Sequence, residues 1–597
     1  MQYSDLQPKK PQHIALSFSG GGFLAASYTL GCISYMESVT IGGKKLTSLV
    51  KFISSASGGS ITNLAYTESQ RKGQPFEEFY RYLYGTALHG TLIVDHAFEI
   101  MKTDQYWKER QDKSRNLINA FSIAYDEVLF KKETFGIYWK PANEAVAEVC
   151  INATEFANGM SFRFQNNGLP GNRFLYFKKD AAAQEALKQI KLGDILACSA
   201  CFPAGFEPFV FPDDFTYHSL AKNALQTAIK EDTRYSPDKD DDEGENELPV
   251  FGIMDGGIDD NQGIDSFILA EDRLRHQNTF GYDLYMTCDV SSNYTSGYNL
   301  PQENKKSLPE KLSLVQYFIG ILLLTAAAVT GIITQTFTGF SFSILGITSV
   351  LLILSVYLAI KAFFIYQRSV RNENTFGIII LKHIYSFIRL RLSALIQLIG
   401  SRITSSVYLS AVIFPKKIRR ISYDRLFEKI TEIKFKTDGT EWQRGEDESL
   451  VAGIKFKHWR QFSLMNAIYL LSPKNDYQRI ADLKAEPWYK ENLYVTINGN
   501  DISLVDLLMP SMVLQETAQL AADTDVTLWY DQFQQQDNRP AAIVAAGQFT
   551  TCYTLLRYAF RFDSSDPYWS DLQQKLIGDW IKFNQSPLWM HVQLSVG

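Results

Sequence analysis

This chain of 597 residues has few cysteines and no excess of basic over acidic residues. It has six cysteines, scattered along its length, and a formal net charge of -6. So few cysteines indicate a reduced compartment rather than a disulfide framework. Without a global basic field, we do not expect nucleic acid to be a partner. The length exceeds that of one ordinary core, so two or more domains are expected.

Metal-binding patterns are scarce as well. Cys198 and Cys201 form a lone C-x-x-C with no second pair nearby, so we expect two packed core thiols rather than a zinc site. The acidic stretch 236–249 resembles a calcium-binding loop, but Glu243 stands where that loop needs glycine and Pro249 where it needs glutamate. We therefore expect a solvated insertion there, and no metal.

Charged side chains are absent from residues 312–360. This stretch contains two apolar segments, 314–333 and 343–364, each near the ~20 residues that cross a bilayer as a helix. A helical hairpin buried in a soluble core is the alternative, and serine and threonine within the segments keep it open. Basic residues flank both ends, which by the positive-inside rule places both flanks in the cytoplasm and the short link outside. These flanking residues are Lys305, Lys306, Lys311, Lys361, Arg368 and Arg371.

The pattern along the chain predicts three regions. Residues 1–300 alternate short apolar strands with helical patterns, which indicates an α/β domain, and residues 301–375 contain the apolar hairpin. Residues 376–597 mix helices with short strands. Within them, a polar stripe along 376–400 predicts a helix that lies in the membrane interface or against a core. The basic segment 415–425 suits anionic lipid heads or an exposed turn. The first ten residues have no apolar run, so we expect no signal peptide.

Three consecutive glycines, Gly20, Gly21 and Gly22, stand between an apolar run and a helical pattern. Together with Ala25 they fit the dinucleotide-binding fingerprint, and a turn of this kind also suits an oxyanion. A dinucleotide site needs an acidic residue at the end of the second strand, about 20 residues further on. The second strand, 49–54, ends in serines instead. The sequence therefore favours the oxyanion interpretation.

Two further strand-turn signals carry reactive side chains. Ser57 follows an apolar strand and precedes Gly58 and Gly59, which fits a nucleophile elbow with the small Ser55 two residues before the serine. Asp255 ends another apolar strand, and two glycines turn the chain directly after it. Taken alone, the first signal also fits an ordinary Ser-Gly turn and the second an Asx turn.

In this order, the glycine turn, Ser57 and Asp255 resemble the patatin-like phospholipases, relatives of the group IV cytosolic phospholipases. The resemblance covers roughly residues 13–292, half of the chain. Three further stretches are similar to blocks of that family: 150–164 with its Asn-Ala-Thr core, 196–209, and 282–292.

The resemblance implies an α/β, three-layer patatin-like domain with a mainly parallel sheet, and hydrolysis of acyl esters by a Ser-Asp dyad. Ser57 would be the nucleophile and Asp255 the base, whose ordinary pKa of ~3.9 the site would have to raise. The turn of Gly20, Gly21 and Gly22 would carry the oxyanion hole, with the N–H groups of the last two as donors. The implied partner is a membrane lipid, and no cofactor or metal is implied.

Leu24 departs from the family's pattern, which usually has Arg or Lys two residues after the third glycine. A cation there could hold a phosphate head group. Its loss makes a neutral lipid, a lysolipid or a thioester a credible substrate; alternatively, a basic residue distant in the sequence replaces it.

Two other classes of function stay open. A Ser-His-Asp hydrolase of the α/β-hydrolase kind needs a histidine after Asp255 in chain order. A membrane-anchored scaffold that has lost activity is supported only by Leu24. The candidate histidines are His276, His383, His458 and His591.

Overall fold

The computed structural model describes residues 10–596 except 89, 109, 141–145, 204, 232–249, 278–280, 292–310, 337, 372–388, 410–412, 492 and 498. The chain forms two compact units, one of Met1–Thr295 with Ala411–Gly597 and one of Ser296–Ser410. This grouping differs from the three regions predicted above, because residues 411–597 belong with the N-terminal α/β region. The predicted insertion 236–249 and the boundary at 375 lie outside the described residues.

An eight-stranded sheet forms the centre of the larger unit, in the order β14-β11-β1-β4-β5-β10-β8, with β6 paired to β5. Most neighbours are parallel, as the resemblance implied. The parallel strands are β1 (Ile14–Phe18), β4 (Val50–Ala56), β5 (Glu148–Glu155), β11 (Leu284–Asp289) and β14 (Ser463–Ala467). The antiparallel strands are β6 (Met160–Gln165), β8 (Phe209–Phe211) and β10 (Phe251–Asp255).

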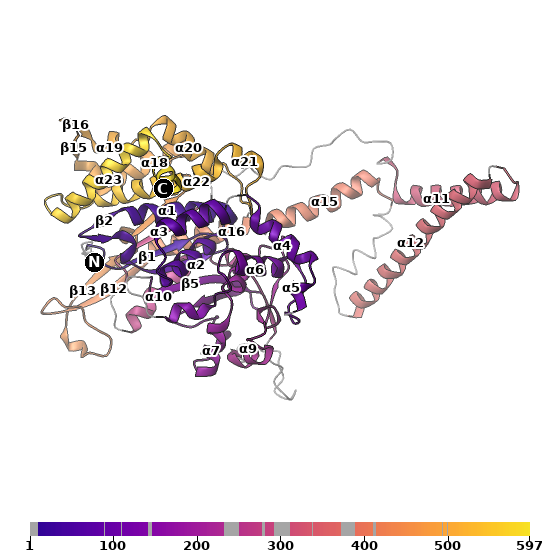
Figure 1. The fold of residues 1–597 in the computed structure, drawn as a ribbon, viewed down its shortest axis with the longest axis horizontal. Helices are drawn as coiled ribbons and strands as arrows, with labels where there is room; N and C mark the ends of the chain where they lie inside the picture. Colours follow the sequence, from indigo (N-terminus) through magenta and orange to yellow (C-terminus); the bar gives the residue numbers. More distant parts are fainter. Residues whose placement is uncertain are drawn as a thin grey trace. The chain divides into compact units, whose positions relative to one another are not determined.

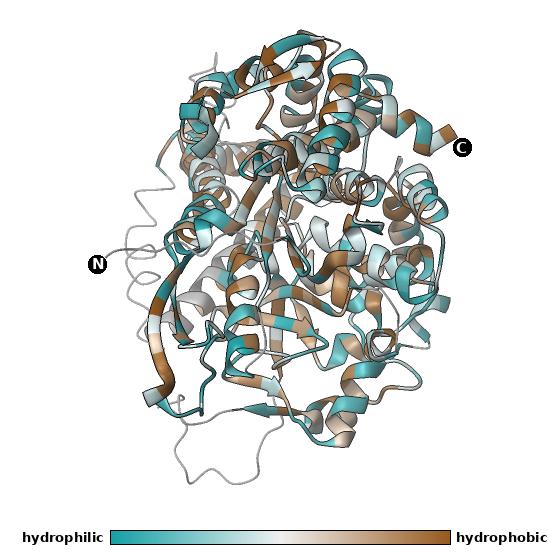
Figure 2. Cartoon of the chain, turned by 90° about the vertical axis from the view of Figure 1, so that its left-hand side faces the viewer, coloured by the Kyte–Doolittle hydropathy of each residue, from teal (hydrophilic) through white to brown (hydrophobic). Residues whose placement is uncertain are grey.

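Side chains on the two faces of the sheet enter two different cores, which makes the unit three-layered. In β1, Ile14 and Leu16 belong to the larger core, whereas Ala15 lies in the smaller one. This alternation follows from the period of two along a strand. The smaller core is closed by α10 (Ile264–His276) and α16 (Phe414–Glu428). Hydrophobic segments run through the middle of the unit, and hydrophilic ones lie mostly towards its edge (Figure 2).

Helix α1 (Gly22–Ser38) is buried along nearly its whole length. A helix that is apolar all round needs cover on every side. The C-terminal helices α22 (Arg539–Ala559) and α23 (Pro567–Gln585) provide it, above α1 in Figure 1. Helices α1 and α22 pack closely because Gly31 has no side chain: a Cβ there would lie only 2.0 Å from the Val544 carbonyl oxygen. Burial of α1 explains why the C-terminal region shares this unit.

The smaller unit contains the two apolar helices predicted from the sequence. Helix α11 (Leu314–Ile333) has the predicted bounds, and α12 (Thr338–Arg371) begins earlier than predicted, because neither proline nor charge interrupts the link. Both are long and apolar enough to span a membrane, and only 6% and 11% of their apolar windows are buried. Helix α15 (Leu392–Tyr408) follows. Most of the interfacial helix predicted at 376–400 lies outside the described residues.

Candidate active site

The glycine turn joins β1 to α1 and is tightly enclosed. Gly21 and Gly22 have φ angles of 141° and 56°, which side-chain-bearing residues rarely adopt. A Cβ on Gly20 would lie 2.5 Å from the Asn261 amide oxygen, and one on Gly22 would lie 2.2 Å from the Thr527 carbonyl oxygen. The three missing side chains therefore leave room for neighbouring parts of the chain.

Not all backbone donors of this turn are available to a ligand. The Gly20 N–H donates to the Asn261 carbonyl at 2.9 Å, and the Phe23 N–H donates to the Thr527 carbonyl at 2.7 Å. Across the described part of the chain, neither the Gly21 nor the Gly22 N–H donates to a protein acceptor. Gly20, predicted as part of the oxyanion hole, thus shapes the turn and has no spare N–H.

Ser57 lies in a strained turn between β4 and α2 (Gly58–Arg71), with φ 49° and ψ -125°. Strain of this kind is typical of a serine held at a sharp strand-to-helix turn. The N–H of Ser57 donates to Ser199 Oγ at 2.9 Å and to the Ser199 carbonyl at 3.1 Å. A Cβ on Gly58 would lie 2.0 Å from the Gly22 carbonyl oxygen, so the serine turn and the glycine turn are packed together.

Asp255 ends β10 beside this turn, and only 3% of the residue is exposed. Its Oδ1 accepts a hydrogen bond of 2.6 Å from the Gly257 N–H. Burial raises the pKa of Asp255 to about 6, while hydrogen bonds from the Gly257 N–H and the Ser57 hydroxyl act in the opposite direction. The structure thus places Ser57 beside Asp255, and the pKa of the Asp255 carboxyl, about 6, lies close to neutral pH.

Three residues to which the sequence analysis gave no role in the site hold these turns in place. Ser199 Oγ donates to the Asn152 carbonyl at 2.7 Å, and the Asn152 side chain donates to the Ser55 carbonyl at 3.0 Å. The Asp255 N–H donates to the Cys201 carbonyl at 3.0 Å. Asn152, Ser199 and Cys201 fall within the sequence blocks similar to the family, which was the only available signal for them.

Leu24 and the paired cysteines lie in the core. Leu24 is 3% exposed, which agrees with its apolar character and keeps it away from any solvated head group. Cys198 and Cys201 are free and buried, as predicted. Among the described residues, no three His, Cys, Asp or Glu side chains form a cluster that could hold a metal ion.

The candidate histidines make their described contacts elsewhere. His276 is exposed and its Nδ1 lies 2.9 Å from Arg444 Nη1. His591 is buried, its Nδ1 lies 2.8 Å from Tyr80 Oη, and burial lowers its pKa to about 4. His383 lies outside the described residues, and His458 ends β13 (Val451–His458) and is the N-cap residue of α17 (Trp459–Phe462). None of these contacts orients a histidine toward Ser57.

Comparison with known proteins agrees with this geometry. No curated protein matches the chain. The crystal structure of VipD from Legionella pneumophila matches with 10% sequence identity and a TM-score of 0.21, over 55% of this chain and 58% of VipD, a likeness too distant to carry an argument. The family model described as patatin-like phospholipase matches residues 16–268, which include the glycine turn, Ser57 and Asp255. The chain therefore contains a patatin-like phospholipase domain.

Proposed function

We propose that this chain is a membrane-anchored lipid acyl hydrolase that cleaves fatty-acyl esters through Ser57 and Asp255. The observation that carries the proposal is the Ser57 hydroxyl beside the buried Asp255 carboxyl, whose pKa burial raises to about 6. A base of this strength is largely ionised at neutral pH and still accepts a proton readily. An exposed aspartate would be a much weaker base.

The proposed reaction has two halves. Asp255 takes the proton from Ser57 Oγ as that oxygen attacks the ester carbonyl, and the N–H groups of Gly21 and Gly22 donate to the oxyanion. One such donor is typically worth ~3 kcal/mol. The C–O bond to the alcohol then breaks, and the protonated Asp255 gives its proton to the leaving oxygen. In the second half Asp255 accepts a proton from water as the water oxygen attacks the acyl-enzyme carbonyl. The bond from the acyl carbon to Ser57 Oγ then breaks, Asp255 returns the proton to that oxygen, and the fatty acid is released.

Helices α11 and α12 would anchor the enzyme. Their apolar windows have a mean hydropathy of 1.9 and 2.1, and basic residues flank the pair at both ends. The positive-inside rule then places both flanks, and with them the larger unit, on the cytoplasmic side. An anchor of this kind raises the effective concentration of the catalytic domain at the surface where its substrate lies.

Leu24 bears on the choice of substrate head group. Since a buried leucine replaces the cation usual in the family, a phosphate has no partner at that position. We therefore include lysolipids, neutral lipids and thioesters with phospholipids as substrates to be tested.

The test is lipid hydrolysis by purified full-length protein in mixed micelles, comparing wild type with Ser57→Ala and Asp255→Asn. Both variants should lose turnover of every lipid that the wild type cleaves, while Ser48→Ala, a half-buried serine remote from the dyad, keeps it. Substantial turnover by Asp255→Asn would refute the dyad and favour a histidine base. Inactivity of the wild type on all four lipid classes would favour the scaffold alternative.

A further inference from the structure

A polar cavity lies in the larger unit, apart from the dyad. Its volume is about 130 Å³, well above the roughly 10–15 Å³ that one water occupies. Neither Ser57, Asp255 nor the glycine turn lines it. The charged residues that line it include Arg110, Lys113, Asp126, Lys132, Lys191 and Asp194.

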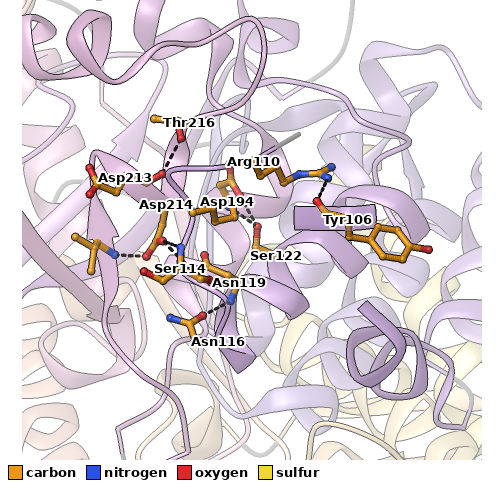
Figure 3. A network of polar contacts seen from close by, with 12 residues as sticks. Tyr106, Arg110, Ser114, Asn116, Asn119, Ser122, Asp194, Asp213, Asp214 and Thr216 are labelled. Carbon is orange, nitrogen blue, oxygen red and sulfur yellow. Dashed lines mark hydrogen bonds and ion pairs between the residues drawn. The ribbon is translucent and has the colours of Figure 1, made fainter. Parts of the chain in front are cut away.

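One ion pair in the wall is already neutralised. Lys113 Nζ lies 2.7 Å from Asp194 Oδ1, and the two side chains are only 2% and 6% exposed. Ser122 also donates to Asp194 (Figure 3). Ser122 lies in α6 (Leu117–Val128), so its bond to Asp194 joins α6 to α8 (Leu192–Ser199), while Lys113 reaches Asp194 from the segment before α6.

Three cations of the cavity have no carboxylate bound to them among the described residues. Arg110 donates to the Tyr106 carbonyl at 2.9 Å (Figure 3), and Lys191 donates to the Lys132 carbonyl at 2.5 Å. Both acceptors are neutral, so they satisfy hydrogen bonds without cancelling charge. With Lys132, these residues give the cavity an excess of positive charge, which favours an anionic ligand.

Asp126 faces this positive charge with an unsatisfied oxygen. The residue is 5% exposed, and its buried Oδ1 has no hydrogen-bond partner in the described chain. Buried acceptors are nearly always paired, because leaving one unpaired costs about 1–3 kcal/mol. Burial also raises the pKa of Asp126 to about 6, which reflects the same lack of solvation. A ligand that donates a hydrogen bond would therefore satisfy this oxygen.

We propose that this cavity binds a small phosphate monoester that also carries a hydroxyl group. Its phosphate would accept hydrogen bonds from Arg110, Lys132 and Lys191, and its hydroxyl would donate to Asp126 Oδ1. Inorganic phosphate satisfies the cations but places more negative charge beside the aspartate, and a neutral polyol leaves the cations unused. The cations need an anionic group and Asp126 needs a hydroxyl donor, and a small phosphate monoester with a hydroxyl group supplies both within one cavity.

The test is calorimetric titration of full-length protein in detergent with glycerol 3-phosphate, inorganic phosphate and glycerol. Glycerol 3-phosphate should bind roughly tenfold more tightly than inorganic phosphate, as expected for one well-placed hydrogen bond to a charged group, and glycerol should not bind measurably. Ser57→Ala should bind as the wild type does, so this result is independent of the hydrolase proposal. Competition by lysophosphatidic acid would identify a lipid head group as the source, and its absence a soluble ester.

Two variants and one matched control locate the site. Lys132→Gln should weaken both anions by about tenfold, through loss of one charged contact, whereas Lys131→Gln, next in the chain but outside the cavity lining, should change neither. Asp126→Ala should remove the preference for glycerol 3-phosphate over phosphate. No anion binding, binding unaffected by Lys132→Gln, or equal wild-type affinity for the two anions would each overturn the proposal.

Discussion

Replacing Asp255 by asparagine should abolish turnover and, at neutral pH, stabilise the fold. Burial raises the pKa of this carboxyl from 3.8 to about 6 in the folded protein. The folded state therefore binds a proton more readily than the unfolded state between these values. Stability contributed by this group is fully present below pH 4 and is lost as the pH rises to 6. The shift corresponds to about 3 kcal/mol at pH 7, which the neutral amide would recover.

The assay is thermal unfolding of wild type and Asp255→Asn in the same detergent, at pH 7.5 and at pH 4. The variant should have the higher Tm at pH 7.5. At pH 4, where the wild-type carboxyl is protonated, the two proteins should differ by under ~1 kcal/mol in free energy of unfolding. Asp272→Asn is the matched control, since Asp272 is 46% exposed and paired with Lys429. A variant no more stable than wild type at pH 7.5 would refute the reasoning.

The same pKa predicts the pH dependence of the rate. With a pKa of about 6 the base is about one-tenth ionised at pH 5, whereas an ordinary aspartate with a pKa of ~3.9 is almost fully ionised there. Wild-type kcat/KM should therefore fall about tenfold between pH 7 and pH 5. Hydrolysis that stays constant over this range would show that the base has an unshifted pKa.

Three further outcomes are expected. Gly22→Ala should lose activity because its Cβ would meet the Thr527 carbonyl at 2.2 Å, whereas Gly43→Ala, also at positive φ but with no atom within 4 Å, should stay active; equal activities would contradict the crowding argument. Ser199→Ala should lower kcat about fivefold with little change in KM, because the Ser57 turn loses one of two acceptors worth about 1 kcal/mol; a change in KM alone would count against this positioning role. Wild type should resist carbonate extraction from membranes. A variant lacking residues 312–365 should cleave a small soluble ester but not bilayer lipid. Full-length protein that stays soluble without detergent would rule out the anchor.

Local signals predicted the turns of the candidate site and one apolar helix. Glycines beside Ser57 and Asp255 marked sharp turns, and the absence of charge over 312–360 marked α11 to its terminal residues. Such features depend on residues close together in sequence, where turn chemistry and apolar length act directly.

Long-range contacts could not be predicted in this way. Strand β14 joins the sheet beside β11 although 173 residues separate Asp289 from Ser463 along the chain. The Thr527 carbonyl bonds to Phe23, and the Asn261 carbonyl occupies the Gly20 N–H. Nothing local to either partner identifies the other, so the grouping of residues 411–597 with the N-terminal region and the use of the Gly20 N–H by Asn261 could be found only from the structure.

The most direct test of the central claim is labelling with a fluorophosphonate probe, which reacts with an activated serine. Full-length protein should be labelled at Ser57, identified by mass spectrometry of the labelled peptide. Ser57→Ala should show no label, and Asp255→Asn should react far more slowly, since its serine lacks the base. Labelling at another serine, no labelling of the wild type, or equal labelling of Asp255→Asn would contradict a Ser57–Asp255 hydrolase.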